Sequence, residues 1–152
     1  MLGIIGGSGL ARLAGLGNPR RSIARTPWGD PSCALTFGEL DGREIVFLAR
    51  HGYGHTIAPH EINYRANVWA LRDAGVEGVV SVATVGGIGS EYGPGAIVVA
   101  DQIVDYTHGR RGTYFDGPNP PVTHVDFTEP YDRALRARLL AAAERAGEAA
   151  ID

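Results

Sequence analysis

The sequence has 152 residues, of which 44% are hydrophobic and 20% are charged, so it is long enough for one domain with a buried core. The formal net charge of −3 provides no basic field for a nucleic-acid backbone, which makes nucleic acid an unexpected partner. The 14 residues counted as Lys or Arg are all arginines, and the lack of lysine excludes both a Walker-type phosphate loop and Schiff-base chemistry at a lysine amine.

Cys33 is the single cysteine, so an internal disulfide and a paired-cysteine metal site are both excluded. No apolar run approaches the length of a membrane-spanning helix, and the N-terminus lacks the charged-then-apolar order of a signal peptide. We therefore expect a soluble protein of the reducing cytoplasm that does not bind membranes.

The first third of the chain is predicted to form strands and a loop. Residues 2–5 form a short apolar run that ends at Gly6-Gly7, which predicts a buried strand entering a tight turn. The segment 15–32 is rich in Gly, Pro and Arg and is expected to be loop. Residues 32–50 contain two β-rich runs around Asp41-Gly42, a pair of residues typical of hairpin turns.

Helices and strands alternate after that point. Residues 59–75 carry apolar side chains at helical spacing, with Pro59 near the first turn and Gly75 after the last. Residues 76–89 and 94–106 each predict a strand, and the first is expected to be buried and to run into a second glycine-rich turn. Residues 128–152 predict an alanine-rich helix that starts at Thr128 and Glu129. This order indicates an α/β domain around a largely buried sheet, a fold that binds ligands at its strand ends.

The opening turn, "IIGGSGL", has two possible ligands. A dinucleotide fingerprint needs a third glycine where Arg12 stands, and its acidic residue would be Asp30, which lies between Gly29 and Pro31 rather than at a strand end. These departures disfavour a dinucleotide site. The hydroxyl of Ser8 and the N–H groups of this turn suit a single anion instead, although a plain tight turn would have the same sequence.

Two further strand ends favour the anion. Arg50 and His51 end one strand, where a guanidinium can bind phosphate oxygens in pairs and the imidazole can add a donor. Ala83 and Thr84 end another, just before Gly86-Gly87. An Arg-His pair is also common in ordinary surface ion pairs. Taken together, the three strand ends suggest one inorganic phosphate held by a hydroxyl, a guanidinium and main-chain groups.

Metal binding is not expected. The three histidines His51, His55 and His60 fall at a strand end, in a loop and at a helix start, and this mixed spacing is not that of a typical metal-ligand set.

Six stretches resemble, in order and spacing, the S-methyl-5'-thioadenosine phosphorylase branch of the purine nucleoside phosphorylase family: "IIGGSGL", "TPWGDPS", "FLARHGYGHTIAPHEINYRANVWAL", "VGGIGSEYGPGAIVVADQIVDYT", "TYFDG" and "VTHVDFTEPYD". The resemblance implies a three-layer α/β/α fold with a mixed central sheet, and a homotrimer. It also implies phosphorolysis of S-methyl-5'-thioadenosine to a free purine and 5-methylthioribose 1-phosphate, with inorganic phosphate as co-substrate and no cofactor.

The resemblance also assigns residues. Ser8 matches the hydroxyl that binds phosphate, and Arg50 with His51 matches the main phosphate contacts. Ala83 and Thr84 match a strand end that touches phosphate and ribose. His124 matches a histidine that a neighbouring subunit places near the 5' substituent of the sugar.

The base half of the family site has no counterpart in residues 1–152, so the acid that protonates the base cannot be assigned. By resemblance this sequence is a single phosphorylase domain that lacks its C-terminal part, and we expect little or no phosphorolysis from it alone. An S-methyl-5'-thioinosine or inosine/guanosine phosphorylase, or a non-catalytic phosphate-binding module, are the alternatives.

Overall fold

The computed structural model describes residues 1–117 and 121–152. The chain divides into two compact units, each of which is described by itself. Unit 1 consists of Met1–Thr84 and His108–Pro118, and unit 2 of Val85–Thr107 and Asn119–Asp152.

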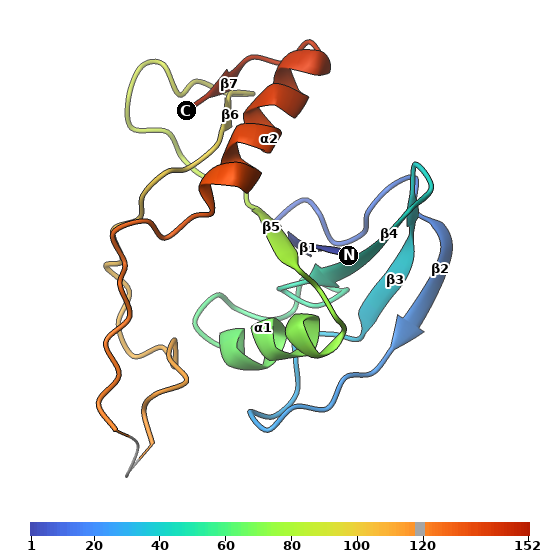
Figure 1. The fold of residues 1–152 in the computed structure, drawn as a ribbon, viewed down its shortest axis with the longest axis vertical. Helices are drawn as coiled ribbons and strands as arrows, with labels where there is room; N and C mark the ends of the chain where they lie inside the picture. Colours follow the sequence, from blue (N-terminus) through green and yellow to red (C-terminus); the bar gives the residue numbers. More distant parts are fainter. Residues whose placement is uncertain (118–120) are drawn as a thin grey trace. The chain divides into compact units, whose positions relative to one another are not determined.

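Unit 1 is built on a five-stranded mixed sheet with the order β2-β3-β4-β1-β5 (Figure 1). β1 is parallel to β4 and β5, whereas β3 is antiparallel to both β2 and β4. The expected mixed α/β fold is therefore confirmed. The strands are β1 (Leu2–Gly6), β2 (Gly17–Ser22), β3 (Leu35–Leu40), β4 (Arg43–Ala49) and β5 (Gly78–Val82).

The hairpin between β3 and β4 turns at Asp41-Gly42, as predicted. Both residues have positive φ, 49° and 72°, which is the backbone of the tight turn that matches the twist of paired strands. β2 is a correction, because its residues were expected to be loop. All six side chains of β2 are exposed, so the segment carries no apolar pattern, and it joins the sheet edge through its backbone, with a register shift between Gly17 and Arg20.

Helix α1 (Tyr64–Asp73) is shorter than predicted at its start. The side chain of Asn63 accepts a hydrogen bond from the Ala66 N–H at 3.1 Å and so caps the helix, which leaves Pro59 in the preceding turn. After the helix, the chain turns at Gly75 (φ 81°), as the sequence indicated.

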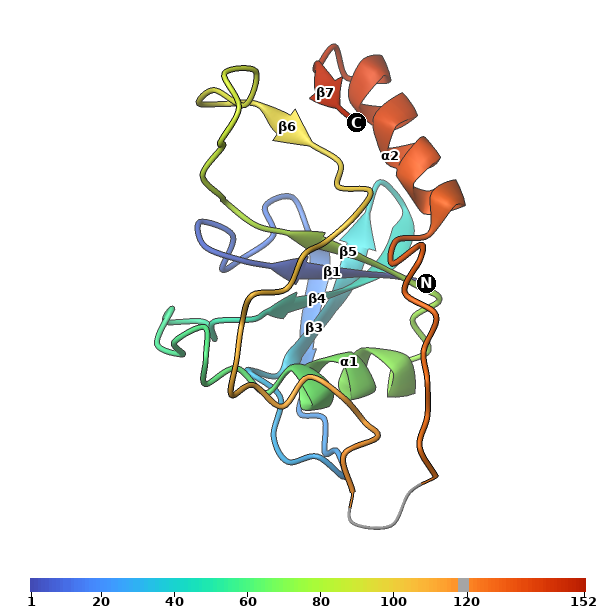
Figure 2. The same ribbon diagram turned by 90° about the vertical axis from the view of Figure 1, so that its left-hand side faces the viewer.

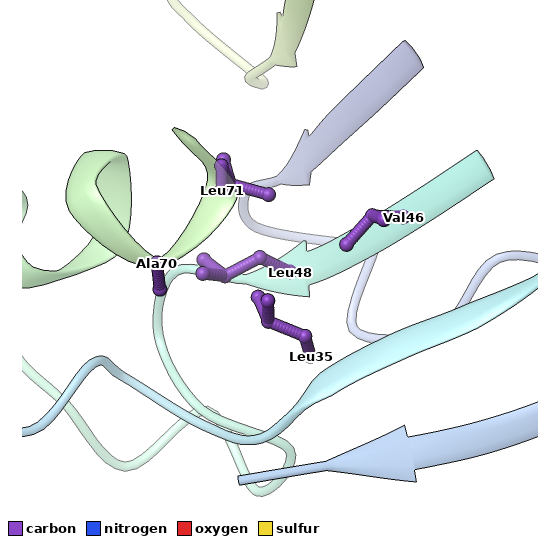
Figure 3. Packing of buried hydrophobic residues seen from close by; sticks show 5 residues of the cluster. All are labelled: Leu35, Val46, Leu48, Ala70 and Leu71. Carbon is purple, nitrogen blue, oxygen red and sulfur yellow. The ribbon is translucent and has the colours of Figure 1, made fainter. Parts of the chain in front are cut away.

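The core of unit 1 lies between the sheet and α1, which covers one face of the sheet (Figure 2). Figure 3 shows five side chains of this cluster pointing toward one another. Val46 and Leu48 come from β4, Leu35 comes from β3, and Ala70 and Leu71 come from α1. All five are almost completely buried, and burial of this apolar area is the main term that stabilises unit 1.

β5 differs from the prediction of a buried strand. It pairs with β1 on one side only and is the last strand of the sheet, so Val79 and Val82 are 39% and 44% exposed. The apolar sequence was read correctly as a strand, but burial depends on neighbours that periodicity does not reveal.

The segment 108–117 belongs to unit 1 and is attached to α1. The guanidinium of Arg65 donates from Nη1 to both carboxylate oxygens of Asp116, at 2.8 and 2.9 Å. Tyr114 donates its hydroxyl to the Arg65 carbonyl at 2.8 Å, and its ring lies 5.2 Å from that of Trp28. Arg65 is nine-tenths buried, so this ion pair is the polar anchor of the segment.

Unit 2 contains helix α2 (Arg133–Arg145) and a parallel pair of two-residue strands, β6 (Ile97–Val98) and β7 (Ala150–Ile151). Two sequence predictions need correction. The strand expected over 94–106 is only two residues long. The helix begins after Asp132, whose side chain accepts from the Leu135 N–H at 2.6 Å, and not at Thr128, because a proline such as Pro130 disfavours helical backbone at the residue before it.

Candidate active site

The ends of three parallel strands meet at one edge of the unit 1 sheet. Gly6 is the register partner of Ala49 in β4 and of Val82 in β5, so the three strands end at the same level. Main-chain bonds continue the alignment, since the Gly7 N–H donates to Val82 O at 2.9 Å and the Arg50 N–H donates to Gly6 O at 3.0 Å. The residues predicted for the phosphate site follow directly: Gly7-Ser8, Arg50-His51 and Ala83-Thr84.

The guanidinium of Arg50 lies against the backbone of Gly7. A Cβ atom placed on Gly7 would stand 2.8 Å from Nη2 and 2.9 Å from Cζ of Arg50. The same Cβ atom would stand 2.7 Å from the backbone carbonyl oxygen of Val82, which cannot move aside as a flexible side chain can. The pairing of Gly7 with β5 therefore requires glycine here, and the space it leaves lets the positive charge of Arg50 lie beside the opening turn.

His51 holds Arg50 in place. Its side chain is 5% exposed, Nδ1 lies 2.8 Å from the Ile57 carbonyl oxygen, and Nε2 accepts from Nε of Arg50 at 3.2 Å. A carbonyl can only accept, so both contacts are satisfied by the neutral tautomer that carries its proton on Nδ1. In this arrangement the imidazole N–H donates to the Ile57 carbonyl oxygen, and Nε2 orients the guanidinium of Arg50.

Thr84 links the first and third strand ends. Its hydroxyl donates to the Ser8 carbonyl oxygen at 3.1 Å. This bond fixes the Ser8 peptide, while Ala83, the residue before Thr84, is exposed at the end of β5. Thr84 thus holds the opening turn in position, and its hydroxyl proton is already in use.

Several donors at this edge have no partner within residues 1–117 and 121–152. They are the Ser8 hydroxyl, the N–H groups of Ser8 and Gly9, and the terminal nitrogens of Arg50. Ser8 and Gly9 are exposed and Arg50 is half-buried, so solvent and solutes reach all of them. Hydroxyl, amide and guanidinium donors of this kind can bind a tetrahedral oxyanion.

His124, the remaining predicted site residue, is exposed and belongs to unit 2. Five predicted residues thus belong to unit 1 and follow its strand ends, and the sixth belongs to unit 2. The rings of His51 and His55 lie 4.6 Å apart, but the described residues contain no group of three potential metal ligands.

Sequence reasoning missed one contributor, Ile57, which acts through its carbonyl. No side-chain signal could have found it, because any residue at that position supplies the same oxygen. The loop that brings it back is fixed by main-chain bonds from Thr56 and Ile57 to the His51 carbonyl, at 3.0 and 3.2 Å.

Comparisons with known proteins identify the family of the chain. The model of the phosphorylase superfamily matches residues 1–152, and the chain therefore belongs to that family. It is 51% identical over 140 residues to a protein of Pseudomonas syringae pv. tomato named as a probable S-methyl-5'-thioinosine phosphorylase, covering 91% of this chain and 56% of the relative. It is also 47% identical over 151 residues to a probable 6-oxopurine nucleoside phosphorylase of Thermococcus kodakarensis, covering 96% of this chain and 56% of the relative.

Solved structures show the same relationship. Methylthioadenosine phosphorylase from Schistosoma mansoni, in complex with tubercidin, superposes with a TM-score of 0.89 at 39% identity, covering 96% of this chain and 52% of that one. The chain thus spans about half the length of the relatives it matches. No helix among the described residues is long and apolar enough to cross a membrane.

Proposed function

We propose that this chain provides the phosphate-binding part of a purine nucleoside phosphorylase that cleaves S-methyl-5'-thioadenosine with inorganic phosphate. The products are the free purine and 5-methylthioribose 1-phosphate. The observation that carries the proposal is the convergence of the unpaired Arg50, Ser8 and Gly9 donors at one sheet edge. The names of the relatives support this class of reaction.

In this proposal the phosphate is both electrostatic stabiliser and nucleophile. As the glycosidic bond to the purine breaks, positive charge develops on the sugar, and a fixed phosphate dianion beneath the ring stabilises it. One phosphate oxygen then attacks the anomeric carbon from a position it already occupies. The bond electrons leave with the base, which takes up one proton from an acid outside the residues assigned here and departs as the free purine. The reaction therefore needs no protein nucleophile, resident metal or cofactor.

Each predicted residue has a role in this scheme. Arg50 and Ser8 bind phosphate oxygens, and His51 orients Arg50. Ala83 and Thr84 form the strand end over which the sugar lies, with Thr84 holding the Ser8 peptide. We further propose that residues 1–152 belong to one phosphorylase domain in a cytoplasmic homotrimer, in which His124 reaches the 5' substituent in a neighbouring subunit.

The identity of the base is open between two classes. Relatives named for S-methyl-5'-thioinosine and for 6-oxopurine nucleosides favour a 6-oxopurine as the second candidate. Both candidates need the same phosphate site, so the tests below separate the site from the choice of base.

The first test is phosphate binding to the 152-residue chain by isothermal titration calorimetry. Replacement of Arg50 by Ala removes charge-assisted hydrogen bonds worth about 1.5–3 kcal/mol, so affinity should fall by roughly 10- to 100-fold. Arg25→Ala is the matched control, because Arg25 is exposed and forms no ion pair with any described residue. Equal affinity in the chain and the Arg50→Ala variant would remove Arg50 from the site.

The second test is phosphate-dependent release of base from S-methyl-5'-thioadenosine, S-methyl-5'-thioinosine and inosine. It is run with this chain and with the complete product of the reading frame that encodes it. Release of one base, lost in Arg50→Ala, supports the phosphorylase and identifies its substrate. Phosphate binding without release of any base from either protein would favour the non-catalytic phosphate-binding module.

A further inference from the structure

Unit 1 has a hollow on the face of the sheet opposite α1. Its volume is about 400 Å³, within the range of sites that bind small molecules. β2, β3, β4 and the segment 11–16 contribute to its wall. None of the residues assigned to the phosphate site lines it.

The floor is a cross-strand row set by the sheet register. Arg21 is the partner of Thr36, and Thr36 is the partner of Phe47, so the three side chains project from neighbouring strands on the same face. Leu16 closes one side above Gly38, where a Cβ atom would stand 2.5 Å from Cγ of Leu16. The hollow is therefore formed by paired strands and depends on a glycine that lets Leu16 approach the sheet.

The hydroxyl groups of Tyr53 and Thr36, which line the hollow, already donate hydrogen bonds within the protein. Tyr53 donates to the Ala34 carbonyl oxygen at 2.6 Å, and the Thr36 hydroxyl lies 2.9 Å from the Tyr53 oxygen. Since the Tyr53 proton is used, Thr36 must donate to Tyr53. Burial raises the pKa of Tyr53, so the phenol stays uncharged at neutral pH. Neither hydroxyl proton is left for a ligand.

Two guanidinium groups supply the remaining polarity. The Arg21 guanidinium carbon stacks 4.1 Å from the centre of the Tyr53 ring, and Arg12 lines the hollow from the segment 11–16. Neither arginine forms an ion pair with a described residue. Stacking occupies the flat face of a guanidinium but leaves the N–H groups at its edge available.

The acidic side chains of β3 and β4 point away from the hollow. Glu39 and Glu44 are register partners, and they lie one position from the pair Gly38 and Ile45. Because successive side chains of a strand point to opposite faces of the sheet, both glutamates lie on the face that carries α1. There Arg20 pairs with Glu44 at 3.1 Å. The sheet thus separates its charges, with the unpaired Arg21 on the face of the hollow.

We propose that this hollow binds a small organic anion that has an aromatic ring and one anionic group. The ring would lie against the half-buried Leu13 and Leu16, above the buried Phe47, and the anion would meet the N–H edges of Arg12 and Arg21. Apolar walls, arginines without carboxylate partners and committed hydroxyls together select this chemistry. The site is separate from the phosphate site and does not depend on the proposed phosphorolysis.

Phenyl phosphate is the probe, with inorganic phosphate and phenol as its two halves. Binding to the 152-residue chain is measured by calorimetry in the Arg50→Ala variant, which weakens the first site. We expect phenyl phosphate to bind this variant, and to bind it at least about tenfold more tightly than either inorganic phosphate or phenol does.

The hollow is tested by Arg12→Ala and Arg21→Ala, each added to Arg50→Ala, with Arg25→Ala as the charge-matched control. Affinity for phenyl phosphate should fall about tenfold or more in the first two and stay within about twofold in the control. Arg12 is exposed on the segment 11–16, so its variant keeps the test valid if loss of the Arg21 stack unfolds β2. Unchanged affinity in Arg12→Ala, or equal loss in Arg25→Ala, would overturn the proposal.

Failure of the two proposals can be told apart. If the chain binds inorganic phosphate through Arg50 but phenyl phosphate shows no dependence on Arg12, only the second site is refuted. If the chain binds phenyl phosphate through Arg12 and shows no Arg50-dependent phosphate binding, only the first is.

Discussion

Unit 1 and unit 2 differ in how they use apolar residues. Every fully buried hydrophobic side chain among the described residues belongs to unit 1, including Leu48 and Leu71. Helix α2 of unit 2 is the longer helix and is rich in the strong helix formers Ala, Leu and Arg, yet it has no buried residue. The difference teaches that α2 depends on helical propensity, whereas α1 depends on packing. The donors proposed to bind phosphate belong to the unit with the core.

The largest expected effect is in hydrogen exchange. β4 is paired on both sides, so its amides should exchange only when unit 1 unfolds, which costs about 5 kcal/mol or more. Amides of α2 should exchange by local opening. We expect protection at Val46 and Leu48 to exceed that at Leu139 and Leu140 by about a thousandfold or more. Comparable protection in NMR exchange experiments would show that the two units unfold together.

A pair of leucine truncations gives the next largest difference. Leu48→Ala should lower the free energy of unfolding of unit 1 by about 2–5 kcal/mol, because it leaves a cavity in the core. The half-exposed Leu139→Ala should cost about 1 kcal/mol or less. Urea unfolding followed by tryptophan fluorescence reports on unit 1, since Trp28 and Trp69 both belong to it. Similar midpoints for the two variants would contradict the comparison.

The two helix caps should differ by a smaller amount. Asn63 caps α1 and also donates to the Trp28 carbonyl at 2.8 Å, so Asn63→Ala should destabilise unit 1 by about 1–2 kcal/mol. Asp132→Ala removes a cap of similar local strength from α2. Its expected result is lower helix content by circular dichroism with no change in the fluorescence midpoint, and a shifted midpoint would argue against independent units.

The smallest effect concerns the reactivity of Cys33. Burial raises the pKa of this thiol, so less thiolate is present at pH 8 and reaction with Ellman's reagent should be slow in the folded chain and faster in urea. The buried neutral thiol also contributes to the free energy of unfolding. That contribution is complete at pH values below the ordinary thiol pKa, and it is lost as pH rises through the raised pKa of the folded chain. The exposed Ala142→Cys, made in a Cys33→Ser background, should react at similar rates in both states.

Sequence patterns predicted the central elements of unit 1 better than the edge strands of its sheet. The Asp41-Gly42 hairpin, β1 and the end of α1 were found because each depends on local backbone preference and apolar spacing. β2 was missed because an exposed edge strand carries no apolar signal. The burial of β5 was overestimated because one sequence does not say which strands have neighbours on both sides.

The residues of the candidate site could be named from the sequence, but the hydrogen bonds that hold them in place could not. Arg50, Ser8 and Thr84 could be named from strand ends and from the family resemblance. Their hydrogen-bond partners could not be predicted, because these depend on which group accepts each proton. In the structure, His51 donates to the Ile57 carbonyl and Thr84 donates to the Ser8 carbonyl. Such assignments need coordinates, since the same side chains could donate to the ligand or to the protein.

The ion pair between Arg65 and Asp116 has a consequence for cutting and transplanting the chain. Residues 108–117 belong to unit 1 although residues 85–107 separate them from the rest of it. A polypeptide stopped at Thr84 would keep the opening turn but leave the Arg65 guanidinium without its carboxylate. Unit 1 is therefore discontinuous along the chain, and a graft of its candidate anion site into another protein would have to carry two separate stretches of sequence rather than one.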